Sequence, residues 1–365
     1  MTARNTTTWW PIVAEHRPTT YVEVLRRHLQ YLVSHPDIGN STSEQAIDTV
    51  CETVGPWATE DLAAFSGWKA WAANDGAPVE FSFAFTRAGS QVRVGYEPSE
   101  LRATGRAYAG EEDLRRLAKL PQVDLQRFDA VRDLFIREGV RNPFMVATAL
   151  SSNKPPLYKG YLYLESTGEP ALAAVSEALD RLGFRHQWQQ VLESLGTSAF
   201  TDGVVEPALI ALDLDPAPEA RVKVYLRQLS GDLNDVERVS STAADYQQGL
   251  YRQILTQLIP TPFDEWDKQP MTCLALRSTA DAPTVATYCP LEPNLPNDAE
   301  SAAAIERLFA AAGVPTNSWD AVKQAITGTK AQTTRRINWV SLKNADDPVI
   351  TVYAGLHGTE VGAAE

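Results

Sequence analysis

Residues 204–227, VVEPALIALDLDPAPEARVKVYLR, contain two short runs of alternating residues around a proline-rich turn. In the second run, Arg221, Lys223 and Tyr225 alternate with aliphatic residues. Because side chains two apart in a β-strand share a face, one face of this strand is basic and aromatic and the other is aliphatic. The stretch therefore predicts a β-hairpin, Val204–Leu212 with Arg221–Arg227, whose two faces meet different surroundings.

The same pattern of paired runs around a turn occurs five times along the chain. The pairs begin at residues 80, 143, 204, 271 and 336, so successive starts are 63, 61, 67 and 65 residues apart. Such even spacing indicates a repeated structural unit. Besides the hairpin above, we expect Glu80–Phe85 with Gln91–Tyr96, Pro143–Leu150 with Leu157–Leu164, Met271–Arg277 with Thr284–Pro290, and Arg336–Leu342 with Val349–Tyr353.

Between the hairpins the apolar period becomes helical, which makes the unit helix, strand, strand, helix. Gly183 and Gly313 are typical stop signals after two of the helical runs. The expected helical stretches are Thr20–Ser34, Thr42–Val54, Thr59–Trp71, Asp124–Gly139, Leu172–Leu182, Tyr246–Leu258 and Asp298–Ala312.

Ten antiparallel strands in one chain predict an α/β fold in which the sheet closes into a ten-stranded β-barrel ringed by α-helices. Closure removes the unpaired sheet edges, and helices would cover the apolar outward face. Ten strands also enclose more room than eight, enough for ligands. A flat sheet with helices on one side is the competing arrangement. We expect a single domain over residues 1–365, with an N-terminal helical segment (1–75) followed by the barrel repeats (76–356).

Composition narrows the class of protein. The formal net charge of −13 argues against a nucleic-acid partner, which would need a basic face. No run approaches the roughly 20 apolar residues of a membrane span. The three cysteines, Cys51, Cys273 and Cys289, are odd in number and far apart, which suits reduced thiols in the cytoplasm. Nothing in the chain indicates an oligomeric state.

If helices cover the apolar faces, the basic and aromatic faces must line one lumen. Several cations in an enclosed space repel one another unless a multivalent anion binds, so they predict a diphosphate site. Tyrosine rings can stabilise a carbocation and exclude water from it. The carboxylate of Glu80, at the start of the first strand, could accept an N–H from an aromatic heterocycle. The alternatives are a solvated sheet face and, for Glu80, a carboxylate in water or paired with Arg93.

Three motifs resemble the dimethylallyl-tryptophan synthase family of aromatic prenyltransferases, in its compact bacterial form. They are Pro78-Val79-Glu80-Phe81-Ser82, Tyr158-Lys159-Gly160-Tyr161-Leu162-Tyr163 and Arg221-Val222-Lys223-Val224-Tyr225, in the family's order. The resemblance implies the ten-stranded ABBA prenyltransferase barrel. It also implies metal-independent, cofactor-free transfer of a dimethylallyl group from dimethylallyl diphosphate to an indole ring of tryptophan or a tryptophan-derived metabolite, as in alkaloid biosynthesis.

The resemblance also implies a role for each matching residue. Glu80 would hydrogen-bond the indole N–H, and Tyr163 would lie on the acceptor side. The diphosphate would bind Arg93, Lys159, Arg221 and Lys223, and the allyl cation would be shielded by Tyr161, Tyr225, Tyr288 and Tyr353. One position departs from the family, because Ala286 stands where fungal members often carry Gln. A different donor length or acceptor pose is therefore open.

Two other functions stay open at this stage. One is a prenyltransferase acting on phenols or naphthols, for which a carboxylate at position 80 is a poorer partner. The other is a non-catalytic barrel that binds an anionic amphiphile in its lumen.

Overall fold

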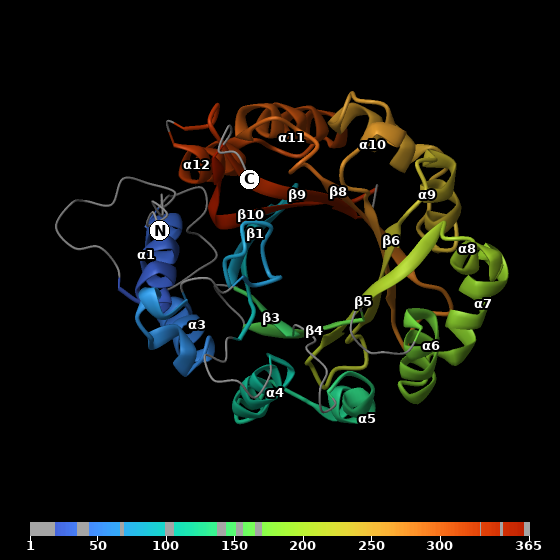
Figure 1. Cartoon of the computed structure of the whole chain (residues 1–365), viewed down its shortest axis with the longest axis horizontal. Helices are drawn as coiled ribbons and strands as arrows, with labels where there is room; N and C mark the ends of the chain where they lie inside the picture. The colour runs from blue at the N-terminus through green and yellow to red at the C-terminus, as the bar shows by residue number, and fades with distance from the viewer. Residues whose placement is uncertain are drawn as a thin grey trace.

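The computed structural model describes residues 19–34, 44–65, 69–98, 106–136, 144–150, 156–164, 170–328, 330–343 and 346–360. Within these ranges ten strands form a closed barrel, drawn at the centre of Figure 1. The strands are β1 Val79–Thr86, β2 Gly89–Tyr96, β3 Phe144–Ala149, β4 Leu157–Tyr163, β5 Val205–Asp213, β6 Val222–Gln228, β7 Met271–Leu276, β8 Thr284–Pro290, β9 Thr334–Lys343 and β10 Val349–Glu360.

The five expected hairpins are confirmed, and every neighbouring pair of strands is antiparallel. The first and last strands close the ring, with Glu80 opposite Gly355 and Phe85 opposite Ile350. Closure leaves no sheet edge, so the flat-sheet alternative is wrong. The barrel has two distinct ends. At the turn end the two strands of each hairpin are joined, and at the helix end the strands connect to helices.

Helices surround the barrel (Figure 1). Around the barrel, α1 lies between α12 and α3 (Figure 1), so the N-terminal helix closes the helical layer next to the C-terminal helix. Among the described residues, no helix is long and apolar enough to cross a lipid bilayer. The helices are α1 Tyr21–Ser34, α3 Glu44–Thr53, α4 Arg106–Leu117, α5 Gln126–Phe135, α6 Ala171–Arg181, α7 Arg185–Leu195, α8 Ser198–Thr201, α9 Leu233–Ser240, α10 Leu250–Leu258, α11 Asp298–Ala312 and α12 Asn317–Thr327.

The expected helix over Thr59–Trp71 is wrong. The chain there forms two short 3₁₀ turns, η1 Pro56–Thr59 and η2 Leu62–Phe65, and residues 66–68 lie outside the described ranges. Asp61 separates the turns, because its backbone forms a β-bridge with Thr20 and its carboxylate accepts the Ala63 N–H. These bonds replace those that a continuous helix would make.

The helix expected from Tyr246 begins later, at Leu250. Gly249 before it adopts a left-handed conformation with φ 78°. The Glu237 carboxylate accepts the N–H groups of Gly249 and Arg252. A residue from outside the helix therefore caps the start of α10.

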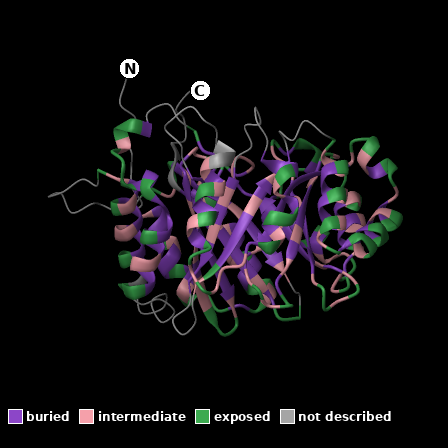
Figure 2. Cartoon of the chain, turned by 90° about the horizontal axis from the view of Figure 1, so that it is seen from below, coloured by how far each residue is buried: buried purple, intermediate pink, exposed green. Residues whose placement is uncertain are grey.

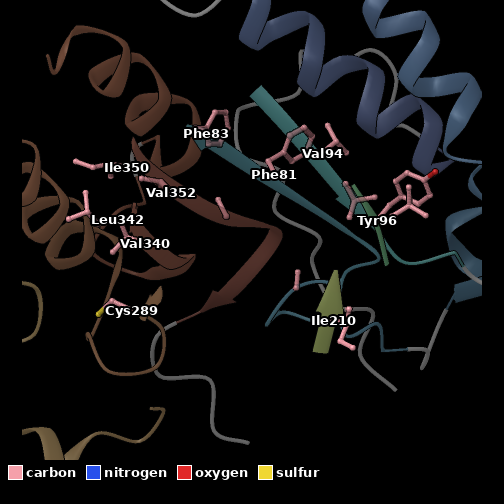
Figure 3. Close-up of a cluster of buried hydrophobic side chains, with 14 of the residues drawn as sticks. Phe81, Phe83, Val94, Tyr96, Ile210, Cys289, Val340, Leu342, Ile350 and Val352 are labelled. Atoms are coloured by element: carbon pink, nitrogen blue, oxygen red, sulfur yellow. The ribbon is translucent and has the colours of Figure 1, made fainter. Parts of the chain in front are cut away.

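The apolar core lies between the barrel and the helices. The outward side chains Phe81, Phe83 and Phe85 of β1 are at most 1% exposed. Phe85 makes edge contacts with Phe309 of α11 and Trp319 of α12. Strands are drawn buried through most of their length in Figure 2, and Figure 3 shows Phe81 and Val352 among the labelled core side chains. Burying each such phenylalanine contributes about 1.5–3 kcal/mol, so this layer stabilises the closed ring.

Candidate active site

The inward faces of the strands line a lumen that is not packed solid. Tyr161, Tyr288 and Tyr353 keep partial exposure, whereas the outward side chains that flank them are buried. Helices cover the outer face, so the solvent contact of these tyrosines is inside the barrel. The lumen therefore leaves room beside its polar side chains, as ligand-binding barrels do.

Basic side chains gather toward the turn end of the lumen. Lys159 of β4 lies opposite Asp213 of β5, and Lys223 of β6 lies opposite Ala211. Arg221 comes directly before β6. Arg93 of β2 lies opposite Ala149, and its Nε donates to Gln91 at 3.0 Å. The four cations expected from the sequence are therefore brought together from β2, β4 and the start of β6.

Asp213 places a carboxylate among these cations. Its Oδ2 accepts from Nε of Arg221 at 2.7 Å, and its Oδ1 lies 3.9 Å from Nζ of Lys159. Burial raises the pKa of Asp213, but Lys159 and Arg221 outweigh burial and hold that pKa at about 2. Asp213 thus stays ionised and partly neutralises the site when no other anion is present.

The two lysines remain short of negative charge despite Asp213. Burial and the neighbouring Lys223 lower the pKa of Lys159 well below its usual value. Burial lowers the pKa of Lys223 to about 8. A bound anion would favour the charged form of each amine and so raise both pKa values.

A row of tyrosines crosses the middle of the lumen. Ring centroids are 6.2 Å apart for Tyr161 and Tyr225, 5.4 Å for Tyr225 and Tyr288, and 5.7 Å for Tyr288 and Tyr353. The hydroxyls of Tyr225 and Tyr288 are 3.3 Å apart. The four rings predicted to act together are therefore neighbours, although they come from β4, β6, β8 and β10. A cation among them would meet aromatic faces on several sides.

Glu80 lies toward the helix end of the lumen. Glu80 is half-buried, and this burial raises the pKa of its carboxyl to about 8, with Asp75 adding to the rise and Lys268 opposing it. Among the described contacts it has no pairing with Arg93, which was its alternative role. Tyr163 lies at the same end, with its ring 6.0 Å from that of Trp71.

The Asn338 amide is 3.3 Å from Oε1 of Glu80, and it has two possible orientations. In one, Nδ2 donates to Glu80. In the other, Nδ2 donates to the Arg336 carbonyl and Oδ1 accepts the Gly355 N–H, each at 3.2 Å. The second orientation satisfies two backbone groups, so we favour it. A protonated Glu80 can then donate to Oδ1, in keeping with its raised pKa.

Several lumen residues were missed by the sequence reasoning. Lys343 ends β9 opposite Ala286, and the expected strand stopped one residue before it. Burial together with Arg221 and Arg277 lowers the pKa of Lys343, which places it beside the cation group. Because Val340 and Leu342 belong to the outward apolar face, the period of two would have placed Lys343 on the inward face. No local signal marks Lys268, which precedes β7 outside any strand.

Ala286 is buried in a small apolar cluster with Cys273 and Tyr225. Its short side chain contributes no polar atom to this wall of the lumen, unlike the Gln often present in fungal relatives. All three cysteines of the chain are buried free thiols.

Two hollows lie outside the barrel and are not this site. One, of about 500 Å³, lies beside α4, and the other, of about 330 Å³, lies between α11 and α12. Arg115 and Arg116 in the first are already paired with carboxylates. Neither hollow is lined by the lumen residues.

Comparison with known proteins gives consistent results. The family model described as tryptophan dimethylallyltransferase matches residues 46–325. A solved 6-dimethylallyl tryptophan synthase has 24% identity and a TM-score of 0.83, with 93% of this chain and 97% of that chain covered.

Two further solved structures were determined in complex with DMASPP and Trp. The 6-dimethylallyltryptophan synthase from Micromonospora olivasterospora has 24% identity and a TM-score of 0.79, covering 92% of this chain and 96% of that one. The 5-dimethylallyl tryptophan synthase from Streptomyces coelicolor has 22% identity and a TM-score of 0.78, covering 93% and 96%. At these identities the likeness shows the fold.

Proposed function

The chain belongs to the tryptophan dimethylallyltransferase family, and we propose that it transfers a dimethylallyl group from dimethylallyl diphosphate to the indole ring of tryptophan or a close derivative. One observation carries this proposal. A single lumen holds cations toward its turn end, a row of tyrosines in the middle, and the Glu80 carboxyl toward its helix end. These three groups match, in order, a diphosphate, an allyl cation and an aromatic N–H.

The cations act on the donor. Arg93, Lys159, Arg221 and Lys223 bind the diphosphate, and Lys343 adds a fifth positive charge nearby. When the C–O bond breaks, its electron pair leaves with the diphosphate, whose negative charge grows. The cations stabilise that charge more in the transition state than in the ester, which lowers the barrier. We propose that these side chains supply the charge that a metal ion would otherwise provide.

The tyrosines act on the allyl cation. Tyr161, Tyr225, Tyr288 and Tyr353 surround it with ring faces and keep water away until the indole attacks. A ring carbon of the indole donates an electron pair, a C–C bond forms, and the ring then loses the proton from that carbon to a base. Aromaticity is restored by this last step.

Glu80 acts on the acceptor. Its carboxylate accepts the indole N–H, which orients the ring and donates electron density to it. Tyr163 and Trp71 pack at the same end, where they contact the acceptor's apolar surface. The positive charge that develops on the attacked ring strengthens the bond to an ionised Glu80, so this contact favours the transition state.

Diphosphate release and prenylated product, measured with dimethylallyl diphosphate and tryptophan in EDTA, test the proposal. Turnover that survives EDTA supports catalysis by protein cations. Turnover lost in EDTA and restored only by magnesium would refute the cation mechanism. Product from naphthols but not from tryptophan would replace the indole assignment, and binding of the donor without any turnover would indicate a non-catalytic barrel.

The matched variants are Lys223→Ala in the lumen and Lys323→Ala on α12. Lys323 is paired with Glu306 on the outer surface, so its loss removes the same charge from the chain without touching the lumen. Lys223→Ala should weaken donor binding, and Lys323→Ala should leave it unchanged.

A further inference from the structure

A short loop lies across the helix end of the lumen. This loop, residues 70–76, is the strap, and it comes just before β1. The N–H of Ala70 donates to the Gly76 carbonyl at 2.9 Å, so the two ends of the strap are joined. The buried carboxylate of Glu97, which directly follows β2, accepts the N–H of Trp71. The strap is therefore anchored at its base, next to β1 and β2.

The strap reaches opposite walls of the barrel. The ring centroids of Trp71 and Tyr163, the last residue of β4, are 6.0 Å apart. Nδ2 of Asn74 donates to the carboxylate of Glu292, two residues after β8. In the ring of strands, β5, β6 and β7 separate β4 from β8, so these two strands face each other across the lumen. The strap therefore spans the mouth of the lumen.

Glu80 lies under the strap. Its neighbour in β10 is Gly355, and a Cβ on Gly355 would lie 2.7 Å from Oδ2 of Asp75, so the strap packs closely against the backbone beside Glu80. The row of tyrosines and the cations lie on the other side of Glu80, toward the turn end. An acceptor cannot reach Glu80 from the turn end once a donor is bound there. It therefore has to enter at the strap.

One amide holds the tip of the strap. Nζ of Lys268 donates to Oδ1 of Asn74 at 2.9 Å, and Nδ2 of Asn74 donates to Glu292, so the amide joins the strap to two charged side chains of the barrel rim. Asn74 is exposed, so water can replace both bonds when the strap opens. Two alanines, Ala72 and Ala73, precede Asn74, and their methyl groups bury little apolar surface. Opening the tip therefore costs little.

We propose that the strap is a lid over the acceptor end of the lumen, that the Asn74 amide is its latch, and that the latch opens to admit the acceptor and to release the product. The closed lid keeps water from the allyl cation on the acceptor side, as the tyrosines do around the cation itself. The identity of the ligand rests on the proposed function, whereas the lid rests on the contacts of the strap.

Binding rates separate a latch from a direct contact with the ligand. Asn74→Ala should raise the association and dissociation rate constants of the acceptor together, by roughly 5- to 30-fold for two exposed hydrogen bonds, and leave Kd unchanged. Loss of a residue that binds the acceptor itself would raise dissociation alone. The measurement is stopped-flow fluorescence of 5-hydroxytryptophan, which can be excited apart from the protein's tryptophans, with inorganic diphosphate present. Unchanged rate constants, or a rise in dissociation alone, would overturn the proposal.

Hydrogen exchange of the free protein tests the lid without a ligand. In Asn74→Ala, the amides of the strap should exchange roughly 5- to 30-fold faster, while those of the barrel strands keep their rates. Glu292→Ala should give the same result from the other side of the latch. Asn234→Ala is the matched control, because exposed Asn234 also joins a cation to a carboxylate, Arg252 to Asp232, but among the outer helices. Strap amides that keep the wild-type rate in both latch variants would overturn the latch.

Failure of the lid and failure of the proposed reaction give different results. A protein that binds no indole amino acid, but whose strap exchanges faster in Asn74→Ala, would refute the proposed acceptor and leave the lid standing. Prenyl transfer to tryptophan with unchanged exchange of the strap would refute the lid and leave the reaction standing.

Discussion

The ionisation of Glu80 provides a direct test of the acceptor mechanism, through the pH dependence of kcat/KM for the acceptor at saturating donor. In the empty site, burial raises the pKa of Glu80 to about 8. A protonated carboxyl is a weaker acceptor for the indole N–H than a carboxylate is. The pH dependence of this kcat/KM reports groups of the donor-bound enzyme. The negative charge of the bound diphosphate favours the protonated carboxyl, so activity should rise with pH at least up to this pKa.

The size of the effect follows from that pKa. With a value of about 8, roughly one molecule in ten has Glu80 ionised at pH 7, and roughly one in a hundred at pH 6. The acceptor's kcat/KM should therefore rise about tenfold for each pH unit from 6 to 8. The assay is initial-rate product formation from pH 5.5 to 8.5, with donor held saturating at every pH.

Glu80→Gln is the matched control, because the amide keeps the shape and cannot ionise. Its profile should be flat over the same range, and its kcat should fall more than its acceptor affinity. An N-methylindole acceptor should be penalised strongly by the wild type and much less by the Gln variant. A wild-type profile that is flat from pH 6 to 8, or a Gln variant that keeps the slope, would refute this role for Glu80.

Stability gives a check that needs no turnover. A carboxyl whose folded-state pKa is raised stabilises the fold fully below its unfolded pKa, near 4.5, and loses that contribution as pH rises through about 8. Between pH 5 and 9, the wild-type melting temperature should therefore fall more than that of Glu80→Gln.

Three further outcomes are expected. Lys223→Ala should weaken donor binding by roughly 10- to 150-fold, the value of about 1.5–3 kcal/mol for a charge-assisted contact, with acceptor affinity nearly unchanged; equal losses for both would indicate a damaged barrel. Because the pKa of Lys223 is about 8 before an anion binds, donor binding should take up protons near pH 8 and weaken at higher pH, and calorimetry in buffers of different ionisation enthalpy measures this. A binding heat that is independent of buffer at pH 8 would contradict that coupling. Phe83→Ala should lower the free energy of unfolding by about 3–5 kcal/mol, measured by urea denaturation, because Phe83 is 1% exposed between barrel and helices.

Much of the fold could be predicted from local alternation. Each of the five hairpins has one apolar face, and a strand with such a face needs a covering layer. The five-fold spacing then leads to a closed ring, because ten strands of this kind would otherwise expose two edges. The helix over Thr59–Trp71 could not be corrected locally, since the backbone bridge from Thr20 to Asp61 that interrupts it joins residues 41 positions apart.

The candidate site divides along the same line. Alternation alone places Lys159 and Tyr161 on one face of a strand, and Lys223 and Tyr225 on one face of another, so the residue types of the site can be predicted from the sequence. The contacts between strands cannot be predicted in this way. The row of tyrosines depends on the register of β6, β7 and β8, and Lys343 joins the cations only because β9 pairs with β8 up to its last residue.

Electrostatics at the site was decided by the tertiary structure alone. The pKa of Glu80 depends on the protein packed around it, and Asp213 is the counter-charge of Arg221 and Lys159. Connecting segments bring together Lys268, Asn74 and Glu292, where Lys268 donates to Asn74 and Asn74 donates to Glu292. These segments have no periodic pattern of apolar residues, so the local sequence does not predict the contacts. Alternation along a strand dictates which way a side chain points, but distance and desolvation arise only when the ring closes and brings remote segments together.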